Sequence, residues 1–488
     1  MRDTLAAVAA CALSLTSLAQ ESHWINPAGG SFGDAANWQP AAVPGASTKV
    51  FFGPASTYTA TLDAPRSLNG VVVTAGSPTL DLGGFRLTLT APLAAQGEQF
   101  TLRNGELYFP PSAGSVSIAA GTTRFEADAR VYQLGGFSTI APGAALIHRG
   151  VWSWCGPSLL GCTDNWVRNE GHLRIEAGII ATGTFESVGL TEMIGGSISH
   201  DGGSSTGTLI MSGGARIGGH NTTGVMGPFH LASGAELYSF GQGVYVGGTG
   251  VFEGTGTRIN GHYRIGQNAH VTVRAGAVLG VSSGALLDNA HLIVQAGGTL
   301  NGYLNFQGAS RLRLEPGSAG PESLWFTSNS TTLEFLIDGA SPFATMPRAG
   351  ASSAEERTLR GQLTIDLINP NPLAVGQTIP LLQHPGGFTG AFNSITLPPL
   401  HGGRALEIAN EPTRVVLRVV QAPPSCHSPD FDGDGAPATD ADIEAFFACL
   451  AGNCCPTCPA SADFNGDGDT GTDADIEAFF RVLAGGNC

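Results

Sequence analysis

The sequence has almost no lysine and little charge of either sign. Lys49 is the only lysine among 488 residues, and charged residues make up 13% of the chain. It also contains no His-Glu-x-x-His zinc motif and no phosphate-binding loop. Common sequence signatures of metalloproteases and nucleotide-binding enzymes are therefore missing.

Glycine, in contrast, is abundant. The chain has 70 glycines, and 42% of its residues are hydrophobic. That hydrophobic content excludes a wholly disordered chain, and so much glycine is typical of many short strands joined by tight turns. We therefore predict an all-β body.

The net charge of −16 is concentrated at one end of the chain. Residues 426–488 contain ten aspartates and two glutamates but a single basic residue, Arg481, and so contribute −11. A chain this acidic is not expected to bind nucleic acid. The expected partner of the acidic segment is a divalent cation.

The first residues have the pattern of an export signal. Arg2 precedes an apolar stretch from Leu5 to Leu18, and Ser17-Leu18-Ala19 matches a small-x-small cleavage site. The stretch is too short to cross a bilayer. We predict a signal peptide over 1–19, and hence a secreted or cell-surface protein without a membrane span in the mature chain. A first strand or helix of the fold is the alternative.

The number of cysteines is consistent with an exported protein. Removal of Cys11 with the signal leaves eight, and an even number in an exported protein predicts disulfides. Six of the eight lie in the 426–488 segment. Zinc binding by Cys454, Cys455 and Cys458 is the alternative for that group.

A short frame, apolar-x-x-Gly-x-x-apolar, recurs at intervals of about 21 residues. Clear copies run over 211–217, 231–237, 273–279 and 294–300. Each copy is expected to be a strand, a glycine turn and the next strand, with its apolar residues facing inward. Stacking of such copies predicts a parallel β-solenoid, or β-helix, over 71–320. Chance spacing of an abundant residue is the alternative.

The frame also predicts which side chains stack on one another. One expected interior column contains Leu231, Val273, Val294 and Leu314. Another contains Ile217, Leu237, Ile259, Leu279 and Leu300. The second residue after the glycine is Arg216, then Glu236, then Arg258, so opposite charges on successive coils should attract by roughly 0.2 to 1 kcal/mol per pair.

The segments before and after the repeats differ from them. Residues 20–70 hold Trp24 and Trp38 in a segment that resembles the opening module of exported bacterial β-helix surface proteins, such as autotransporter passengers. The resemblance implies an N-terminal cap in which the two tryptophans cover the first open coil. A sugar-stacking platform is the alternative.

Downstream of the repeats, 321–420 is predicted to form a β-rich C-terminal cap resembling a β-sandwich. Its expected strands are 362–368, 378–383 and 414–420. Residues 421–425 are predicted to be a stiff linker.

The strongest chemical signal is a duplicated acidic loop. Asp430-Phe-Asp-Gly-Asp-Gly is followed 33 residues later by Asp463-Phe-Asn-Gly-Asp-Gly. Calcium takes roughly six to eight oxygen ligands, which alternate residues of a tightly coiled loop can supply. We predict two calcium ions. Their expected ligands are Asp430, Asp432, Asp434 and the Ala436 carbonyl in one loop, and Asp463, Asn465, Asp467 and the Asp469 carbonyl in the other.

Each loop runs into Asp-Ile-Glu-Ala-Phe-Phe, whose apolar residues have helical spacing. The predicted stripes, expected to pack face to face, are Ile443, Phe446, Phe447 and Leu450, and Ile476, Phe479, Phe480 and Leu483. A loop followed by one helix is half of an EF-hand, and 426–488 resembles a type I dockerin repeat pair. In cellulosomal proteins such a pair docks onto a cohesin. The resemblance therefore implies a cohesin-like or other surface protein as partner.

The loops depart from the standard pattern at their ends. A standard calcium loop closes with an acid at its twelfth position, where both copies here have alanine. We predict that Asp442 and Asp475 close the loops just before each helix, with Asp440 and Asp473 as alternatives.

The cysteines that flank the loops suggest how each repeat is clipped together. The expected disulfides join Cys426 to Cys454 and Cys458 to Cys488, although other connectivities are open. Calcium that serves docking and calcium that only folds the module are both consistent with the sequence.

Two functions from different classes follow. The first is a non-enzymatic structural or adhesive solenoid outside the cell, tethered or stabilised by its calcium module, with extracellular polysaccharide as a further candidate partner. The second is a polysaccharide lyase or glycoside hydrolase that the module delivers to a scaffold. Such catalysis needs carboxylates gathered on one face, whereas the acids of the coil region are scattered. They are Glu170, Glu176, Glu186, Glu192, Asp201, Glu236, Glu253 and Asp288. We therefore expect no enzyme and assign no catalytic residue.

Overall fold

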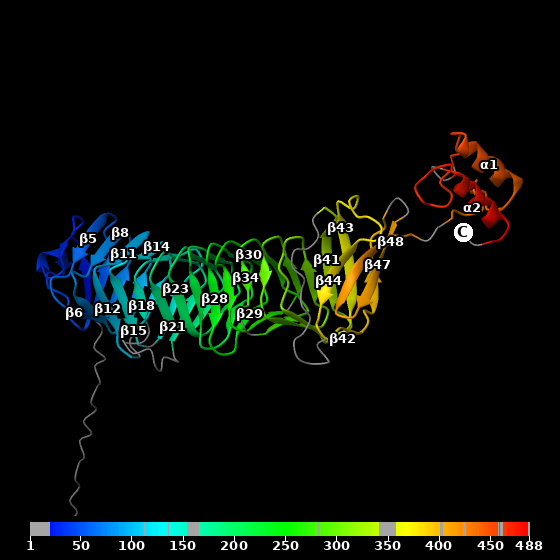
Figure 1. Ribbon diagram of the computed structural model, residues 1–488. Helices are drawn as coiled ribbons and strands as arrows, with labels where there is room; N and C mark the ends of the chain where they lie inside the picture. Colours follow the sequence, from blue (N-terminus) through cyan, green and yellow to red (C-terminus); the bar gives the residue numbers. More distant parts are fainter. Residues whose placement is uncertain are drawn as a thin grey trace, which may run out of the picture. The chain divides into compact units, whose positions relative to one another are not determined.

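The computed structural model describes residues 20–111, 114–134, 136–153, 165–266, 268–280, 284–340, 358–400, 404–422, 426–456, 458 and 462–486. The predicted signal peptide, most of the 421–425 linker and Cys488 lie outside these residues. The chain is 49% strand and 6% helix, and its strands form a parallel β-solenoid of about 13 turns with coils of about 21 residues (Figure 1). The predicted fold class is confirmed.

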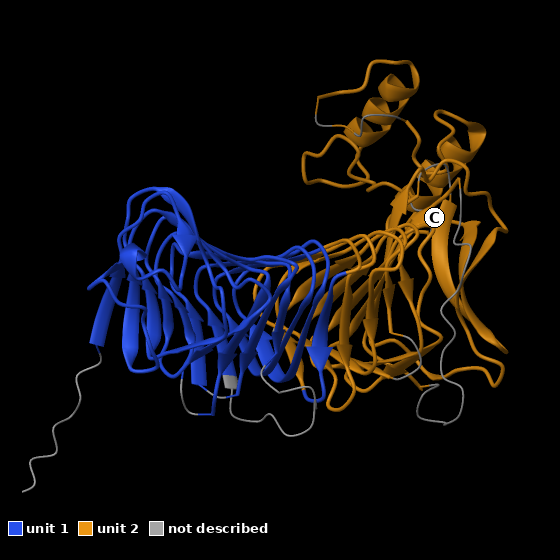
Figure 2. Ribbon diagram, turned by 90° about the vertical axis from the view of Figure 1, so that its left-hand side faces the viewer, with its two compact units in different colours: residues 1–211, 215–221 blue, residues 212–214, 222–488 orange. Residues whose placement is uncertain are grey.

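The chain divides into two compact units (Figure 2). Unit 1 comprises residues 1–211 and 215–221, and unit 2 comprises residues 212–214 and 222–488. No helix in the described part of the chain is long and apolar enough to cross a membrane.

Unit 1 contains three parallel ladders, because each coil contributes one strand to each ladder. The first ladder contains β2 (Gly30–Ser31), β5 (Thr57–Thr61), β8 (Ser77–Asp81), β11 (Gln99–Arg103), β14 (Thr122–Phe125), β17 (Ala145–His148), β20 (His172–Ile175), β22 (Leu190–Met193) and β24 (Leu209–Met211). The second contains β6 (Arg66–Leu68), β9 (Arg86–Leu89), β12 (Gly105–Phe109), β15 (Ala129–Gln133), β18 (Val151–Ser153), β21 (Ile179–Ser187), β23 (Ser197–Ser205) and β25 (Arg216–Gly219). The third contains β1 (Gln20–Trp24), β4 (Thr48–Phe52), β7 (Gly70–Val73), β10 (Leu93–Ala95), β13 (Val116–Ile118), β16 (Gly136–Ile140) and β19 (Asn165–Asn169), and ends on the second halves of β21 and β23.

Unit 2 repeats this arrangement. Its first ladder contains β27 (Phe229–Leu231), β30 (Gly250–Phe252), β33 (His270–Val273), β36 (His291–Val294), β39 (Arg311–Leu314), β41 (Thr332–Asp338), β43 (Gln362–Ile368) and β46 (Ser394–Thr396). The second contains β28 (Glu236–Ser239), β31 (Arg258–Asn260), β34 (Val278–Leu279) and β37 (Thr299–Leu300). The third contains β26 (Thr223–Val225), β29 (Val244–Val246), β32 (Tyr263–Gly266), β35 (Ala285–Asp288), β38 (Tyr303–Gln307) and β40 (Ser323–Phe326).

The glycines of the repeated frame have the backbone conformation that the sequence predicts. The glycines of the four clear copies all have positive φ, between 74° and 86°, which only glycine adopts without strain. Val273 pairs with Val294, and Val294 with Leu314, so the stacking of these three members of the predicted interior column is confirmed. These three side chains are at most 1% exposed. One coil alone cannot bury such a face, but the stack does.

Arginine and carboxylate side chains tie successive coils together on the outer surface. Arg258 Nη2 lies 3.2 Å from Glu236 Oε2 on the preceding coil, as the charge alternation predicts. Glu176 lies 2.6 Å from Arg149 of the preceding coil and 2.9 Å from Arg174 of its own coil. Such pairs, each with a solvent-accessible arginine, add little stability individually, about 0.2 to 1 kcal/mol each, but they favour a single register.

The first coils bury both tryptophans of the N-terminal segment. Trp24 and Trp38 are 2% and 1% exposed, and their rings meet edge to face with centroids 5.1 Å apart. Trp24 lies in β1, which pairs with β4 in parallel and with β3 (Trp38–Gln39) in the antiparallel sense. Buried rings cannot stack on a sugar, so the platform alternative is wrong for these two residues. Coil stacking already begins within 20–70.

The region after the repeats differs from a β-sandwich. The parallel ladder continues through β41, β43 and β46, and a separate antiparallel sheet has the order β44-β48-β47. The sheet strands are β44 (Thr378–Gln383), β47 (Arg404–Glu411) and β48 (Arg414–Gln421), and a short pair joins β42 (Thr358–Leu359) to β45 (Thr389–Gly390). The three strands expected here from sequence are present. Of these, β43 pairs with stacked coils, because the solenoid supplies open parallel edges, whereas β44 and β48 pair with each other in the antiparallel sheet.

Substituting Gly178 tests how tightly the coils approach. Gly178 has φ +81°, and a Cβ there would lie 1.7 Å from the Gly150 carbonyl oxygen of the preceding coil. Gly143 has nearly the same φ, +79°, but open space around it. We expect Gly143→Ala to cost about 1 to 2 kcal/mol from backbone strain alone. Gly178→Ala should cost a further 1 to 3 kcal/mol, roughly, because it also displaces a neighbouring coil. Urea denaturation compares the two variants, and equal midpoints would contradict this explanation.

Candidate metal-binding loops

The acidic segment forms two loop–helix repeats around a small aromatic core. Helices α1 (Asp440–Leu450) and α2 (Asp473–Leu483) follow the two loops. Phe446 and Phe479 are fully buried, and their rings stack with centroids 4.0 Å apart. The two predicted helices and the contact between them are therefore present.

One residue of each predicted apolar stripe faces solvent instead of the core. Phe447 and Phe480 are 44% and 43% exposed, and their ring centroids lie 6.0 Å apart. Phe431 and Phe464, from the second position of each loop, fill the core in their place. The predicted packing is thus wrong for Phe447 and Phe480, because the loop phenylalanines occupy that place in the core. The other stripe positions pack in or against the core, as predicted. The repeated phenylalanine after the first aspartate of each loop was the signal for this.

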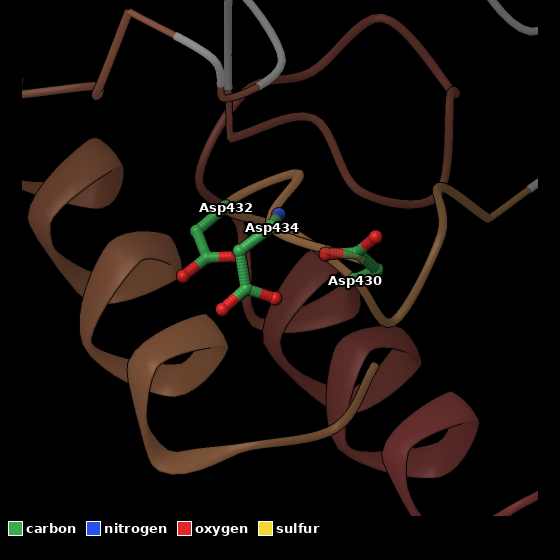
Figure 3. A group of neighbouring side chains, drawn as sticks. All are labelled: Asp430, Asp432 and Asp434. Carbon is green, nitrogen blue, oxygen red and sulfur yellow. The ribbon is translucent and has the colours of Figure 1, made fainter. Parts of the chain in front are cut away.

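The first loop gathers three carboxylates. Oxygen atoms of Asp430, Asp432 and Asp434 all lie within 4.8 Å of one another (Figure 3). The loop is held by its own backbone: the Asp434 amide donates to Asp432 Oδ1 over 3.0 Å, and the Gly435 amide donates to Asp430 Oδ2 over 3.1 Å. The three predicted side-chain ligands are therefore brought together.

The electrostatics of this cluster favour a bound cation. A hydrogen bond from the Asp434 amide lowers the pKa of Asp432, but desolvation and the charges of Asp434, Asp442 and Asp430 outweigh it and raise the pKa. Asp430 Oδ1 is buried and has no hydrogen-bond partner among the described residues. A buried carboxylate oxygen without a donor is costly unless a cation reaches it.

The second loop has the same backbone pattern and a slightly different acidic set. The Gly468 amide donates to Asp463 Oδ2 over 2.9 Å, and the Asp467 amide donates to Asn465 Oδ1 over 3.0 Å. The carboxylates that lie within 4.8 Å of one another are Asp463, Asp467 and Asp475. Both acidic clusters could hold metal ions.

The predicted closing residues lie inside the helices rather than just before them. Asp442 is the third residue of α1 and is fully buried. Its Oδ1 accepts from the Phe431 amide over 2.6 Å, and its Oδ2 accepts from the Thr439 amide over 2.8 Å. Burial by itself would raise the pKa of Asp442, but these hydrogen bonds lower it. Asp442 therefore links loop to helix and lies outside the first cluster.

Asp475 both links its loop to its helix and belongs to a carboxylate cluster. Its Oδ2 accepts from the Thr472 amide over 2.8 Å and its Oδ1 accepts from the Asn465 amide over 3.2 Å, as in a helix-capping arrangement. It nevertheless belongs to the second cluster. The alternatives Asp440 and Asp473 are the exposed first residues of their helices, in neither cluster, where the helix dipole favours acids.

The seventh positions continue the turn in both loops. The Ala436 amide donates to Asp434 Oδ1 over 2.7 Å, and the Asp469 amide donates to Asp467 Oδ1 over 2.9 Å. Each loop therefore coils one residue past its last clustered carboxylate. The carbonyl ligands predicted at Ala436 and Asp469 stay predictions.

The disulfides of the segment differ from the predicted pairing. Cys449 pairs with Cys454, and Cys455 pairs with Cys458. The expected pairs of Cys426 with Cys454 and Cys458 with Cys488 are therefore wrong. Both disulfides join cysteines that lie close together in the sequence, at and after the end of α1. Cys454, Cys455 and Cys458 are therefore oxidised and cannot supply thiolates to zinc.

Most acids of the coil region named above form ion pairs with arginine or histidine, namely Glu170, Glu176, Glu186, Glu192, Glu236, Glu253 and Asp288. Hydrogen bonds from the Arg149 guanidinium, and then from Arg174, lower the pKa of Glu176. A hydrogen bond from His230, and then from Arg274, lowers the pKa of Glu253. A general acid in glycoside hydrolysis needs a raised pKa instead. Groups of three or more acidic, histidine or cysteine side chains that could hold a metal occur, within the described residues, only in the two loops.

Fold and loops together define a β-solenoid protein with a C-terminal pair of acidic loop–helix repeats. No protein-family model, no curated protein and no solved structure matches this chain.

Proposed function

We propose that the protein is an exported, non-enzymatic surface or matrix protein. Its β-solenoid is tethered or stabilised by a dockerin-like module that binds two calcium ions. The observation that carries the proposal is the first loop, where three carboxylates converge and one buried carboxylate oxygen, Asp430 Oδ1, lacks a donor among the described residues. Oxygen-only donor sets in flexible loops suit calcium better than transition metals.

Export is supported by the disulfides and the solenoid. The pairs Cys449–Cys454 and Cys455–Cys458 require an oxidising compartment to persist. Repetitive stacks with outer ion-pair ladders suit a durable scaffold. The alternative of a polysaccharide lyase or hydrolase finds less support, because most candidate acids of the coil region are held in ion pairs with arginines or histidines.

Docking is the proposed use of the exposed aromatic pair. Phe447 and Phe480 occupy equivalent positions on the two helices and expose nearly half of each side chain. Exposed neighbouring aromatics of this kind are typical anchors at protein interfaces. A cohesin-like or other surface protein is the proposed partner.

Calorimetric titration of calcium into the full chain tests the proposal. We expect two sites per chain in the wild type and none in the double variant Asp430→Ala/Asp463→Ala, because each substitution removes the first ligand of a loop. The matched control, Asp440→Ala/Asp473→Ala, changes exposed acids outside the clusters and should still bind two ions. Absence of binding by the wild type at millimolar calcium would overturn the proposal.

A further inference from the structure

An open groove lies on the outer face of the third ladder of unit 2. It crosses β29, β32, β35 and β38, and has a volume of about 420 Å³. Its lining combines tyrosines, glycines and planar polar side chains, among them Tyr245, Tyr303, Arg264, Asn305 and Gln242. We infer that this groove binds a neutral oligosaccharide.

Glycines make the hollow. In the register of the ladder, Gly243, His262, Gly284 and Tyr303 occupy one outward row on successive coils. A Cβ at Gly284 would lie only 1.8 and 2.0 Å from two ring carbons of Tyr303, so the ring extends over the bare backbone of the neighbouring coil. Tyr303 is still 49% exposed, which presents an aromatic surface to solvent.

The next outward row supplies polar groups and a second ring. It contains Tyr245, Arg264, Leu286 and Asn305, which are direct neighbours across the ladder. The Arg264 guanidinium lies 5.8 Å from the centre of the Tyr245 ring and forms an ion pair with Asp288. The arginine is thereby fixed in place, with its charge already balanced.

A neutral sugar polymer fits this chemistry best. The C–H face of a pyranose packs against an aromatic ring, while its hydroxyls need planar donors and acceptors such as amides, guanidinium and carboxylate. An acidic ligand would compete with Asp288 for Arg264, and an apolar one would desolvate Arg264, Asn305 and Gln242 without compensation. A polymer is favoured over a monosaccharide because the groove spans four coils, each about 4.8 Å from the next. A second hollow, lined by Tyr245, Arg264, Asn268, Asp288 and Asn289, continues it.

This inference rests on the adhesive role proposed above and supplies its ligand class. It does not involve the calcium loops. The Asp430→Ala/Asp463→Ala variant should therefore keep its sugar binding, so loss of calcium binding and loss of sugar binding are separately observable.

The test measures binding of the full chain to cello-, xylo-, manno- and galacto-hexaoses, with oligogalacturonate as the acidic comparison. We expect the wild type to bind at least one neutral hexaose. Tyr303→Ala should weaken binding at least about tenfold, since it removes a stacking surface. Gly284→Ala should weaken it similarly, because the new methyl group displaces the Tyr303 ring while no positive φ opposes alanine there.

Tyr132→Ala is the matched control. Tyr132 is a half-buried outward tyrosine of β15 in unit 1, far from the groove in sequence, and its loss should leave binding unchanged. Thermal melting of each variant checks that the fold is retained. The inference is overturned if the wild type binds no neutral hexaose, binds only oligogalacturonate, or binds as tightly after Tyr303→Ala in a folded protein.

Discussion

Phe446→Ala is expected to unfold the C-terminal module and abolish its calcium binding. The Phe446 ring is fully buried, stacks on Phe479 and meets Phe431 edge to face at 5.3 Å. Truncating a buried phenylalanine costs about 3 to 5 kcal/mol. A module of about 60 residues has little stability to lose, so the variant should populate the unfolded form.

Hydrogen–deuterium exchange of the full chain, followed by mass spectrometry, measures this effect. Peptides covering α1 and α2 should exchange rapidly in Phe446→Ala, whereas solenoid peptides keep their protection. Phe447→Ala is the matched control, since it removes the same side chain from the adjacent, exposed position. It should preserve helix protection and calcium binding. Equal exchange in the two variants would show that the core assignment is wrong.

Acidification is expected to destabilise unit 1 through two buried histidines. His148 and His200 are 0% and 3% exposed, and burial lowers the pKa of each to about 4. His148 lies inside the coil stack between Phe125 and Ile175 of adjacent coils, and its Nε2 is 3.2 Å from the Ile179 carbonyl oxygen. Its interior position suits only the neutral ring.

The pH dependence follows from proton linkage. In the unfolded chain these histidines have their ordinary pKa of 6.5, so below that pH the unfolded state binds more protons than the folded state. Stability is therefore fully present above pH 6.5 and falls as pH decreases toward 4. Each histidine should account for a loss of about 3 kcal/mol over this window.

Urea denaturation of the wild type and of His148→Gln/His200→Gln between pH 7.5 and 4 checks this expectation. Glutamine cannot become charged. The free energy of unfolding of the variant should therefore fall by about 6 kcal/mol less than that of the wild type between pH 7.5 and 4. At pH 7.5 the histidines are neutral in the folded state, and any difference there reports packing alone. Parallel curves for the two proteins would refute the linkage.

The solenoid was predictable because its information is local and periodic. A glycine with positive φ between two inward apolar residues specifies a turn and two strand ends, and repetition at about 21 residues specifies stacking. The column through Val273, Val294 and Leu314 follows directly from the spacing of the glycines. The acidic loops were equally visible, since alternate carboxylates and a glycine form a contiguous motif.

The aromatic core of the module was only half predictable. Helical spacing places Phe446 and Phe447 in one stripe, but it cannot say which of two adjacent phenylalanines the loop will cover. In the structure Phe431 packs in the core with Phe446, and Phe464 packs there with Phe479, so Phe447 and Phe480 stay outside it. The disulfide pairing depends on how the chain turns after α1, and the spacing of the cysteines does not determine that turn.

The sequence by itself determined the all-β class, the coil length, the interior columns and the two acidic loops, because each depends on residues close together in the chain or repeated at a constant interval. Only the tertiary structure decided that Asp442 links loop to helix while Asp475 also joins a cluster, that the solenoid acids pair with arginines of neighbouring coils, and that Tyr245 and Tyr303 border one groove. These features depend on the positions of side chains on different coils and repeats, and such positions are set by packing in three dimensions rather than by local spacing.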